Sequence, residues 1–314
     1  MSNALPSLRQ LRYLVTLSET LNFRRAAESL YVTQSTLSAG IKELENVLGA
    51  MLVERDKRNV RFTPLGYEVV ERARKMLAQA EDLVQLARGS QEPLSGLLRL
   101  GVIPTIAPFL LPMVLPVLRE AHPHLQLYLR EDLTERLIDR VESGDLDFAL
   151  IALPYDTGDL IVRELFKDEF WFVARQGDKL AREKEIAIKD IDTASVLLLE
   201  EGHCLRDHTI EACGARRMAA RHSDLEATSL FTLLQMVHNG MGVTLLPDMV
   251  IKAGALVGSQ LAARPFSHRV PSRTIALVMR RSSPLAVDFE LLADLIAAHH
   301  RENTRTRSAS RARR

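Results

Sequence analysis

Cysteine is scarce in this 314-residue chain, which contains only Cys204 and Cys213. Two cysteines exclude the class of small, disulfide-rich domains, because such domains need several cross-links in place of a large core. No run of 18 apolar residues occurs, so a transmembrane helix is not expected. Residues 1–10 lack the apolar segment of a signal peptide. We therefore expect a cytoplasmic protein without a membrane partner, in which any disulfide is transient and redox-sensing.

An excess of charge is also missing, since the formal net charge is +1 at pH 7. This total hides an uneven distribution. Residues 1–65 carry nine Lys or Arg against six Asp or Glu, whereas residues 91–300 carry a net charge of −7. A basic N-terminal module on an acidic body indicates a polyanionic partner for that module alone. Residues 301–314 contain six Arg, one Glu and almost nothing apolar, so we predict a basic disordered tail.

The two cysteines lie close together in a segment with chemically active neighbours. His203 directly precedes Cys204, and Arg206 follows two positions later. Cationic or hydrogen-bond-donating neighbours favour the reactive thiolate. A second nearby thiol, here Cys213, could convert an oxidised sulfur into a disulfide.

Helical geometry would turn this pair into a switch. If residues 204–213 are helical, they rise about 13 Å and the two side chains point in opposite directions. A disulfide needs Cα atoms roughly 4.4–6.8 Å apart, so oxidation would have to rebuild the segment. Two other interpretations stay open. The cysteines could be passive core residues, or they could join His203, His208 and His222 in a zinc site. The spacing lacks the pairs typical of structural zinc sites, so we expect no metal.

Residues 7–62 have the pattern of short helices with one sharp turn. An apolar face runs through residues 11–17, a second helix is expected at 24–30, and a third at 34–48 after the N-cap Thr33. This arrangement is typical of a helix-turn-helix, whose recognition helix presents its first residues to the major groove. A hairpin over residues 52–62 would form a wing.

Nine polar residues of the recognition helix and wing are predicted to bind DNA. Gln34 could pair with adenine, the next two positions could read base edges, and the basic wing suits the backbone or the minor groove. The helical pattern alone would also fit an ordinary bundle with a solvated basic face. The predicted residues are Thr33, Gln34, Ser35, Thr36, Ser38, Lys42, Arg55, Lys57 and Arg58.

A long helix is predicted from Pro64 to Arg88, with Thr63 as its N-cap. Its apolar residues recur at the alternating spacing of a coiled-coil seam, which predicts a homodimer and hence a two-fold symmetric DNA site. The predicted seam consists of Val69, Ala73, Met76, Ala80, Leu83 and Ala87.

From residue 91 the pattern changes to alternating strands and helices, which predicts an α/β fold with a predominantly parallel sheet. Such folds bind ligands at the carboxyl ends of their strands. Strands are expected at 97–102, 125–129, 146–153, 170–174, 196–199, 243–246 and 273–279. Helices are expected at 109–120, 133–142, 230–239 and 286–299.

The run from Phe23 to Ser38, with Leu52-Val53-Glu54-Arg55 and Thr63-Pro64-Leu65-Gly66, resembles the winged helix-turn-helix of LysR-type transcriptional regulators. The resemblance implies a DNA-binding regulator rather than an enzyme. It implies an N-terminal all-α winged helix-turn-helix domain at 1–65, a dimerisation helix at 66–90 and an α/β two-lobed regulatory domain, similar to periplasmic binding proteins, at 91–300. Lobe I would comprise 91–165 and 271–300, and lobe II 166–270. Ala39-Gly40 depart from the family, which often has larger polar residues there.

The segment from Gly202 to Asp207, with Cys213 at matching spacing, resembles the OxyR branch of this family, the hydrogen peroxide sensors. The resemblance implies that Cys204 reacts with peroxide and that Cys213 resolves the product as a reversible Cys204–Cys213 disulfide. It implies no cofactor. The pocket implied around Cys204 consists of Thr105, Thr134, His203, Arg206, Asp207 and Arg273.

The same resemblance implies the partners. They are double-stranded promoter DNA, a homodimer or homotetramer, hydrogen peroxide, RNA polymerase, and glutaredoxin or thioredoxin as reductant. The target genes would be oxidative-stress genes of the catalase and peroxidase type. The alternative is a metabolite-responsive LysR-type regulator whose cysteines are passive.

Overall fold

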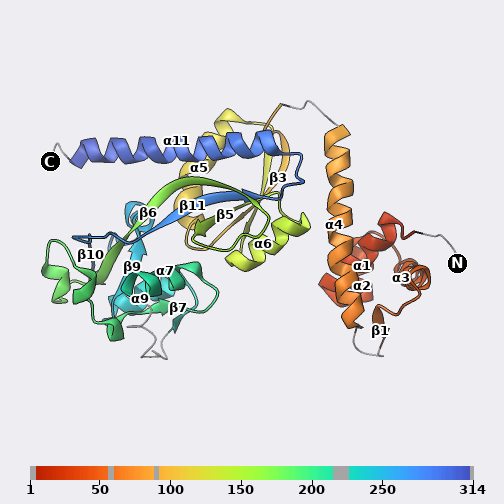
Figure 1. Ribbon diagram of the computed structural model, residues 1–314, viewed down its shortest axis with the longest axis horizontal. Helices are drawn as coiled ribbons and strands as arrows, with labels where there is room; N and C mark the ends of the chain where they lie inside the picture. The colour runs from red at the N-terminus through yellow and green to blue at the C-terminus, as the bar shows by residue number, and fades with distance from the viewer. Residues whose placement is uncertain (1–4, 56–59, 88–91, 215–225, 312–314) are drawn as a thin grey trace. The chain divides into compact units, whose positions relative to one another are not determined.

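The computed structural model describes the backbone of residues 5–55, 60–87, 92–214 and 226–311 (Figure 1). The chain forms two compact units, one made chiefly of residues 1–91 and the other chiefly of residues 92–314. The predicted DNA-binding domain and dimerisation helix therefore fall in one unit. No helix in the described ranges is long and apolar enough to cross a membrane.

The N-terminal unit is a helical domain with a small hairpin, as the sequence predicts. Its recognition helix has the predicted bounds because Thr33 caps its start and Gly49, at a positive φ of 66°, ends it. The hairpin strands pair antiparallel. The elements are α1 (Leu8–Thr20), α2 (Phe23–Ser29), α3 (Gln34–Leu48), β1 (Val53–Arg55), β2 (Val60–Phe62) and α4 (Pro64–Ala87).

Gly40 allows α1 and α3 to pack closely. A Cβ atom at this position would lie 2.6 Å from Cδ2 of the Tyr13 ring. Tyr13 is buried, and its hydroxyl accepts a hydrogen bond from Nε of Arg9 at 2.6 Å. The small residue at position 40 is therefore explained by helix packing, whereas the sequence offered only a lost base contact.

The second unit is an α/β domain built on a seven-stranded sheet. Its strands are β3 (Gly96–Val102), β4 (Leu125–Glu131), β5 (Phe148–Leu153), β6 (Ile161–Arg175), β9 (Thr244–Pro247), β10 (Leu261–Arg264) and β11 (Ser272–Met279). A separate two-stranded sheet joins β7 (Leu198–Leu199) to β8 (Glu226–Ala227). The helices are α5 (Ala107–Ala121), α6 (Thr134–Ser143), α7 (Cys204–Cys213), α9 (Leu230–His238), α10 (Asp248–Lys252) and α11 (Ala286–Arg311). Short 3-10 helices occupy Leu180–Arg182, Ile188–Asp190 and Thr193–Ser195.

The prediction of a predominantly parallel sheet is wrong. β3 pairs parallel with β4 and β5, but β11 pairs antiparallel with both β5 and β6, and β6 pairs antiparallel with β9 and β10. The reason is that the chain returns late and inserts β11 between two earlier strands. Local periodicity carries no information about that insertion.

The long strand β6 crosses the predicted boundary between the lobes. Its first part pairs with β11, and its last part, from Phe170, pairs with β9 and β10. In this register Arg273 on β11 lies directly opposite Asp168 on β6. The division of the domain into lobes at residues 165 and 270 stays a prediction.

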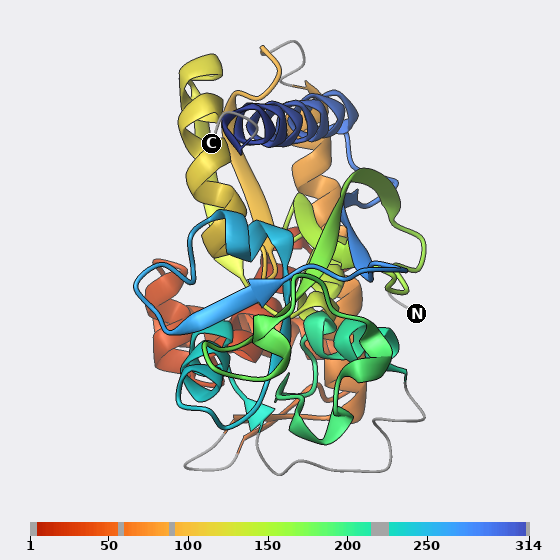
Figure 2. The same ribbon diagram turned by 90° about the vertical axis from the view of Figure 1, so that its left-hand side faces the viewer.

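Helices cover the sheet on both sides. Both views show α11 beside α5 along one face, with α7 and α9 on the other side of the domain (Figures 1 and 2). His300 of α11 stacks on Phe166 of β6 with ring centroids 3.6 Å apart. The helix continues to Arg311, whereas we predicted disorder from residue 301. Extending an existing helix costs less than starting one, which explains the difference.

Candidate functional site

The two cysteines mark the two ends of α7. Cys204 is the first residue of the helix and Cys213 is the last. Both are buried, with 5% and 2% of their surface exposed, and both are thiols. The condition on which the switch argument rests, a helix over residues 204–213, is therefore met. Gly202, at a positive φ of 95°, makes the turn that leads into the helix.

Arg273 lies fully buried in the same domain and is held by several bonds. Its Nε donates to Asp168 Oδ2 at 3.0 Å. Its Nη1 donates to Thr105 Oγ1 at 2.7 Å, and its Nη2 donates to the Thr105 carbonyl at 3.1 Å. The other Asp168 oxygen accepts from the Met249 backbone N–H at 3.0 Å. This network joins β6, β11, the loop between β3 and α5, and the first turn of α10.

Burial raises the pKa of the Cys204 thiol, because a thiolate is poorly solvated inside the protein. Four groups act on this pKa besides burial. The Arg273 guanidinium, the Thr134 hydroxyl and the Leu205 backbone lower it, whereas the Asp207 carboxylate raises it. The position of Cys204 at the start of α7 also favours negative charge on the sulfur.

The groups that favour the thiolate are not the neighbours expected from the sequence. Arg206 points to a different place, where its Nη1 donates to the Leu199 carbonyl at 3.0 Å and pairs with Glu226. Burial lowers the pKa of His203, which hydrogen-bonds the Thr228 backbone, so this imidazole is neutral at neutral pH. The favourable charge comes instead from Arg273, which is distant in sequence.

The remaining predicted pocket residues fall into two groups. Thr105 and Thr134 are buried, the first against Arg273 and the second facing the Cys204 sulfur. Asp207 is exposed, and burial together with Glu201 raises its pKa against the effect of Arg206. The fold thus brings together Cys204, Thr105, Thr134 and Arg273. Asp207 lies at the solvent-exposed edge of this group.

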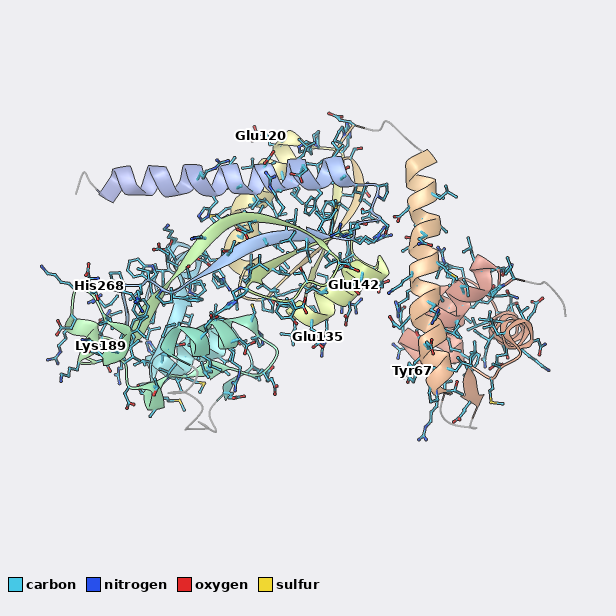
Figure 3. All side chains as sticks on the ribbon, in the orientation of Figure 1. Tyr67, Glu120, Glu135, Glu142, Lys189 and His268 are labelled. Carbon is cyan, nitrogen blue, oxygen red and sulfur yellow. The ribbon has the colours of Figure 1, made fainter. Side chains whose placement is uncertain are left out.

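The space outside Cys204 is acidic. The pKa of Tyr155 is raised by burial and then by the carboxylates of Glu135 and Asp139 on α6, with further contributions from Cys204 and Asp207 on α7. Glu135 is labelled in Figure 3. The helices α6 and α7 and the loop after β5 therefore face a common space.

Two buried polar side chains of this region have fewer hydrogen-bond partners among the described residues than their polar atoms can bond. Thr134 has only the Cys204 thiol, and His208 has only the Pro154 backbone. Buried polar groups are normally bonded, so these atoms indicate a place for a small polar molecule.

Three features of this site were missed in the sequence. Asp168 sits in the middle of β6, where no signal in the sequence marks this carboxylate as the buried one. Other charged residues of the same strand are Arg163, Glu164, Lys167, Glu169 and Arg175. The position of Cys204 at the start of a helix, which favours its thiolate, was also missed. The signal for it was Gly202 followed by a helical pattern. His208 appeared only as a zinc ligand. No cluster of three or more metal-binding side chains occurs in the described part of the chain, and His222 lies outside it.

The predicted DNA-contacting residues lie mostly on the outside of the N-terminal unit. Gln34, Ser35, Thr36 and Lys42 are exposed, and Ser38 is half-buried. Thr33 is also exposed, but its hydroxyl accepts a hydrogen bond from the Thr36 backbone as the cap of α3. On the wing, the Arg55 side chain, Lys57 and Arg58 lie outside the described residues. The recognition surface is therefore available for DNA.

The predicted dimer seam on α4 is split. Ala73 is 1% exposed and packs, with Val69, in the core of the N-terminal unit against α1. Met76 and Leu83 are 53% and 66% exposed, and Ala80 is half-buried. The Ala87 side chain lies outside the described residues. The second half of the helix is thus the part free to meet a partner.

The chain matches two family models over most of its length. Residues 8–67 match the bacterial regulatory helix-turn-helix protein of the lysR family, and residues 91–301 match the LysR substrate binding domain.

Relatives cover nearly the whole chain. It is 48% identical to the HTH-type transcriptional regulator EstR of Acinetobacter baylyi, over 93% of this chain and 97% of that protein. It is 39% identical to the hydrogen peroxide-inducible genes activator of Dickeya chrysanthemi, over 96% of this chain and 100% of that protein. A full-length OxyR variant from Pseudomonas aeruginosa has a TM-score of 0.79 and 37% identity, covering 94% and 95% of the two chains.

Proposed function

This chain belongs to the LysR family of bacterial transcriptional regulators, and on that premise we propose that it senses hydrogen peroxide through Cys204. The observation that carries the proposal is the buried Cys204 thiol at the start of α7, next to Arg273, Thr105 and Thr134. The similarity to hydrogen peroxide-inducible activators and to OxyR structures supports it. A small pocket of this kind suits a small, polar oxidant.

The first reaction step oxidises Cys204. The thiolate sulfur attacks one oxygen of hydrogen peroxide, so that an S–O bond forms and the O–O bond breaks. The second oxygen leaves as hydroxide and takes up the proton lost by the thiol, giving water and a sulfenic acid. Arg273 stabilises the thiolate before the attack, and the Thr105 and Thr134 hydroxyls orient the peroxide.

The second step forms the Cys204–Cys213 disulfide. The Cys213 sulfur attacks the Cys204 sulfur, the S–O bond breaks, and the oxygen leaves as water with the proton of the Cys213 thiol. Because intact α7 separates its two ends by about 13 Å, the helix has to unwind before the sulfurs meet. The unwinding is the conformational signal.

The signal then reaches the promoter. A dimer assembled through α4, or a tetramer of such dimers, presents its α3 helices to double-stranded DNA, and oxidation changes their spacing and the contact with RNA polymerase. The regulated genes are oxidative-stress genes of the catalase and peroxidase type. Reduction by a dithiol protein such as glutaredoxin or thioredoxin returns two electrons and restores α7.

The test is a peroxide titration of the purified reduced protein. One equivalent of hydrogen peroxide is added, thiols are mapped by mass spectrometry, and DNase footprints on the protein's own promoter are compared. We expect a Cys204–Cys213 disulfide and a changed footprint in the wild-type protein, a stable sulfenic acid in Cys213→Ser, and no change in Cys204→Ser.

The same experiment addresses the alternative of a metabolite-responsive regulator. This alternative stays open because the 48% identical relative is named EstR and its name does not mention peroxide. Thiols that remain unmodified at low peroxide, with an unchanged footprint, would rule out peroxide sensing. A screen of small metabolites for footprint changes would then follow.

A further inference from the structure

His208 is the buried polar residue that the proposed reaction does not use. It is 6% exposed, and apart from the Pro154 backbone its ring has no hydrogen-bond partner among the described residues. It follows Cys204 by four positions on α7, so the two side chains lie on one face with Cβ atoms about 5–6 Å apart.

The surroundings of His208 keep its imidazole neutral. Burial and, to a lesser extent, the Arg273 charge lower its pKa to about 4, against the opposing effect of a hydrogen bond with the Pro154 backbone. Its other neighbour is the Phe170 ring, whose centroid lies 6.4 Å away. A neutral imidazole has one nitrogen that donates a hydrogen bond and one that accepts.

A buried imidazole with one ring nitrogen left unpaired lowers the stability of the fold. A leucine or methionine of similar size would fill this space without that penalty. Residues that lower stability in this way are concentrated at functional sites. The Thr134 hydroxyl, whose only hydrogen-bond partner in the described part of the chain is the Cys204 thiol, faces that thiol from α6. His208 lies one helical turn after Cys204 on α7.

We propose that His208 is a peroxide-binding residue, whose ring hydrogen-bonds the second oxygen of the peroxide while the Cys204 sulfur attacks the first. The inference rests on the proposed function and adds a residue to its site. Hydrogen peroxide donates and accepts hydrogen bonds at both oxygens, so it satisfies both His208 and Thr134. During the reaction the leaving oxygen takes the proton released by Cys204, and His208 is neutral before and after. The bond that His208 makes to this oxygen strengthens as negative charge develops on it.

The experiment compares the rates of two reactions at the same sulfur. The second-order rate constant of Cys204 oxidation by hydrogen peroxide is measured in the reduced full-length protein by quenched thiol labelling. The rate of Cys204 alkylation by iodoacetamide is measured at the same pH. The variants are His208→Leu, His208→Met and His208→Gln. The control is Thr209→Val, which removes another buried polar group of α7 whose hydroxyl donates to the Leu205 carbonyl.

We expect His208→Leu and His208→Met to slow oxidation by peroxide about tenfold, because one hydrogen bond to the leaving oxygen is lost. His208→Gln should recover most of the rate, since its amide also donates and accepts. Alkylation should be unchanged in all variants, and Thr209→Val should behave as the wild type. Apolar variants should melt no lower than the wild type.

Wild-type rates of peroxide oxidation in His208→Leu or His208→Met would overturn this role. Equal slowing of oxidation and alkylation would also overturn it, because His208 would then only shape the helix. If His208→Leu does not fold, His208→Met and His208→Gln still decide the question. A wild-type protein whose Cys204 does not react with peroxide would instead refute the proposed function and this inference together.

Discussion

Arg273 has one buried carboxylate as its counter-charge, besides its two hydrogen bonds to Thr105. Asp168 accepts from its guanidinium and from the Met249 backbone, and both side chains of the ion pair are almost completely buried. Removing one partner of such a pair leaves the other charge uncompensated. The residue that holds the thiolate-stabilising charge is thus as important for the site as the charge itself.

Substitution of Asp168 should therefore affect stability and thiol chemistry together. Asp168→Ala should lower the free energy of unfolding by about 3–5 kcal/mol, and Asp168→Asn by less. In Asp168→Asn the less neutralised Arg273 should shift the pH profile of Cys204 alkylation to lower pH. Urea unfolding and alkylation rates measure the two effects. An alkylation profile that does not move would show that Arg273 does not act on Cys204.

The buried histidines make the regulatory domain sensitive to acid. The pKa of His208 is lowered to about 4, and burial also lowers the pKa values of His203 and His300. The unfolded chain then binds more protons than the folded one below pH 6.5. Keeping His208 neutral favours the folded state fully above pH 6.5. As the pH falls towards 4, the free energy of unfolding decreases on this account by up to about 3 kcal/mol. Urea unfolding at pH 7 and pH 5 should show a smaller difference for His208→Gln. An identical difference in both proteins would contradict this account.

At the level of helices and strands, local signals predicted the ends of α3 and α4 well. Thr33, Gly49 and Pro64 act on backbone groups within a few residues, so their effect can be read from sequence. The short strands β8 and β10 were not predicted, because each exists only through its pairing with a distant strand.

The same distinction applies to the candidate site. Cys204 was identified from the scarcity of cysteine and from its neighbours, whereas Thr105, Thr134 and Arg273 were identified through a family resemblance. Asp168 could not be found in that way, because its role comes from lying opposite Arg273 in the β6–β11 register. The direction of Arg206, towards Glu226, likewise depends on where β8 lies. Contacts set by strand pairing are invisible to local patterns.

A substitution at Gly40 tests whether the packing of α3 against Tyr13 outweighs the low helix propensity of glycine. Gly40→Ala gains about 1 kcal/mol of helix propensity but places a methyl group against the Tyr13 ring. We expect a net loss of about 1–2 kcal/mol, because the ring is buried and fixed by Arg9. Thermal melting measures this loss. The double variant Tyr13→Leu with Gly40→Ala should recover part of it, whereas strict additivity would argue against the contact.

For the whole molecule, the exposed part of α4 is expected to control assembly. If the proposed dimer forms through α4, Leu83→Glu should convert it to monomer and weaken DNA binding, because the substitution places a charge in the predicted apolar seam. Gln79→Glu adds the same charge at another exposed position of α4 and should leave the dimer intact. Sedimentation velocity measures both. A dimeric Leu83→Glu protein would place the interface elsewhere.

The coincidence of α7 with the two cysteines has a consequence for timing. In the proposed reaction the sulfenic acid forms while the helix is still intact, and DNA contacts change only after the helix opens. A reductant that arrives between these steps erases the event before it reaches a promoter. The regulator would then behave as a delay filter, which ignores brief bursts of oxidant and answers sustained ones.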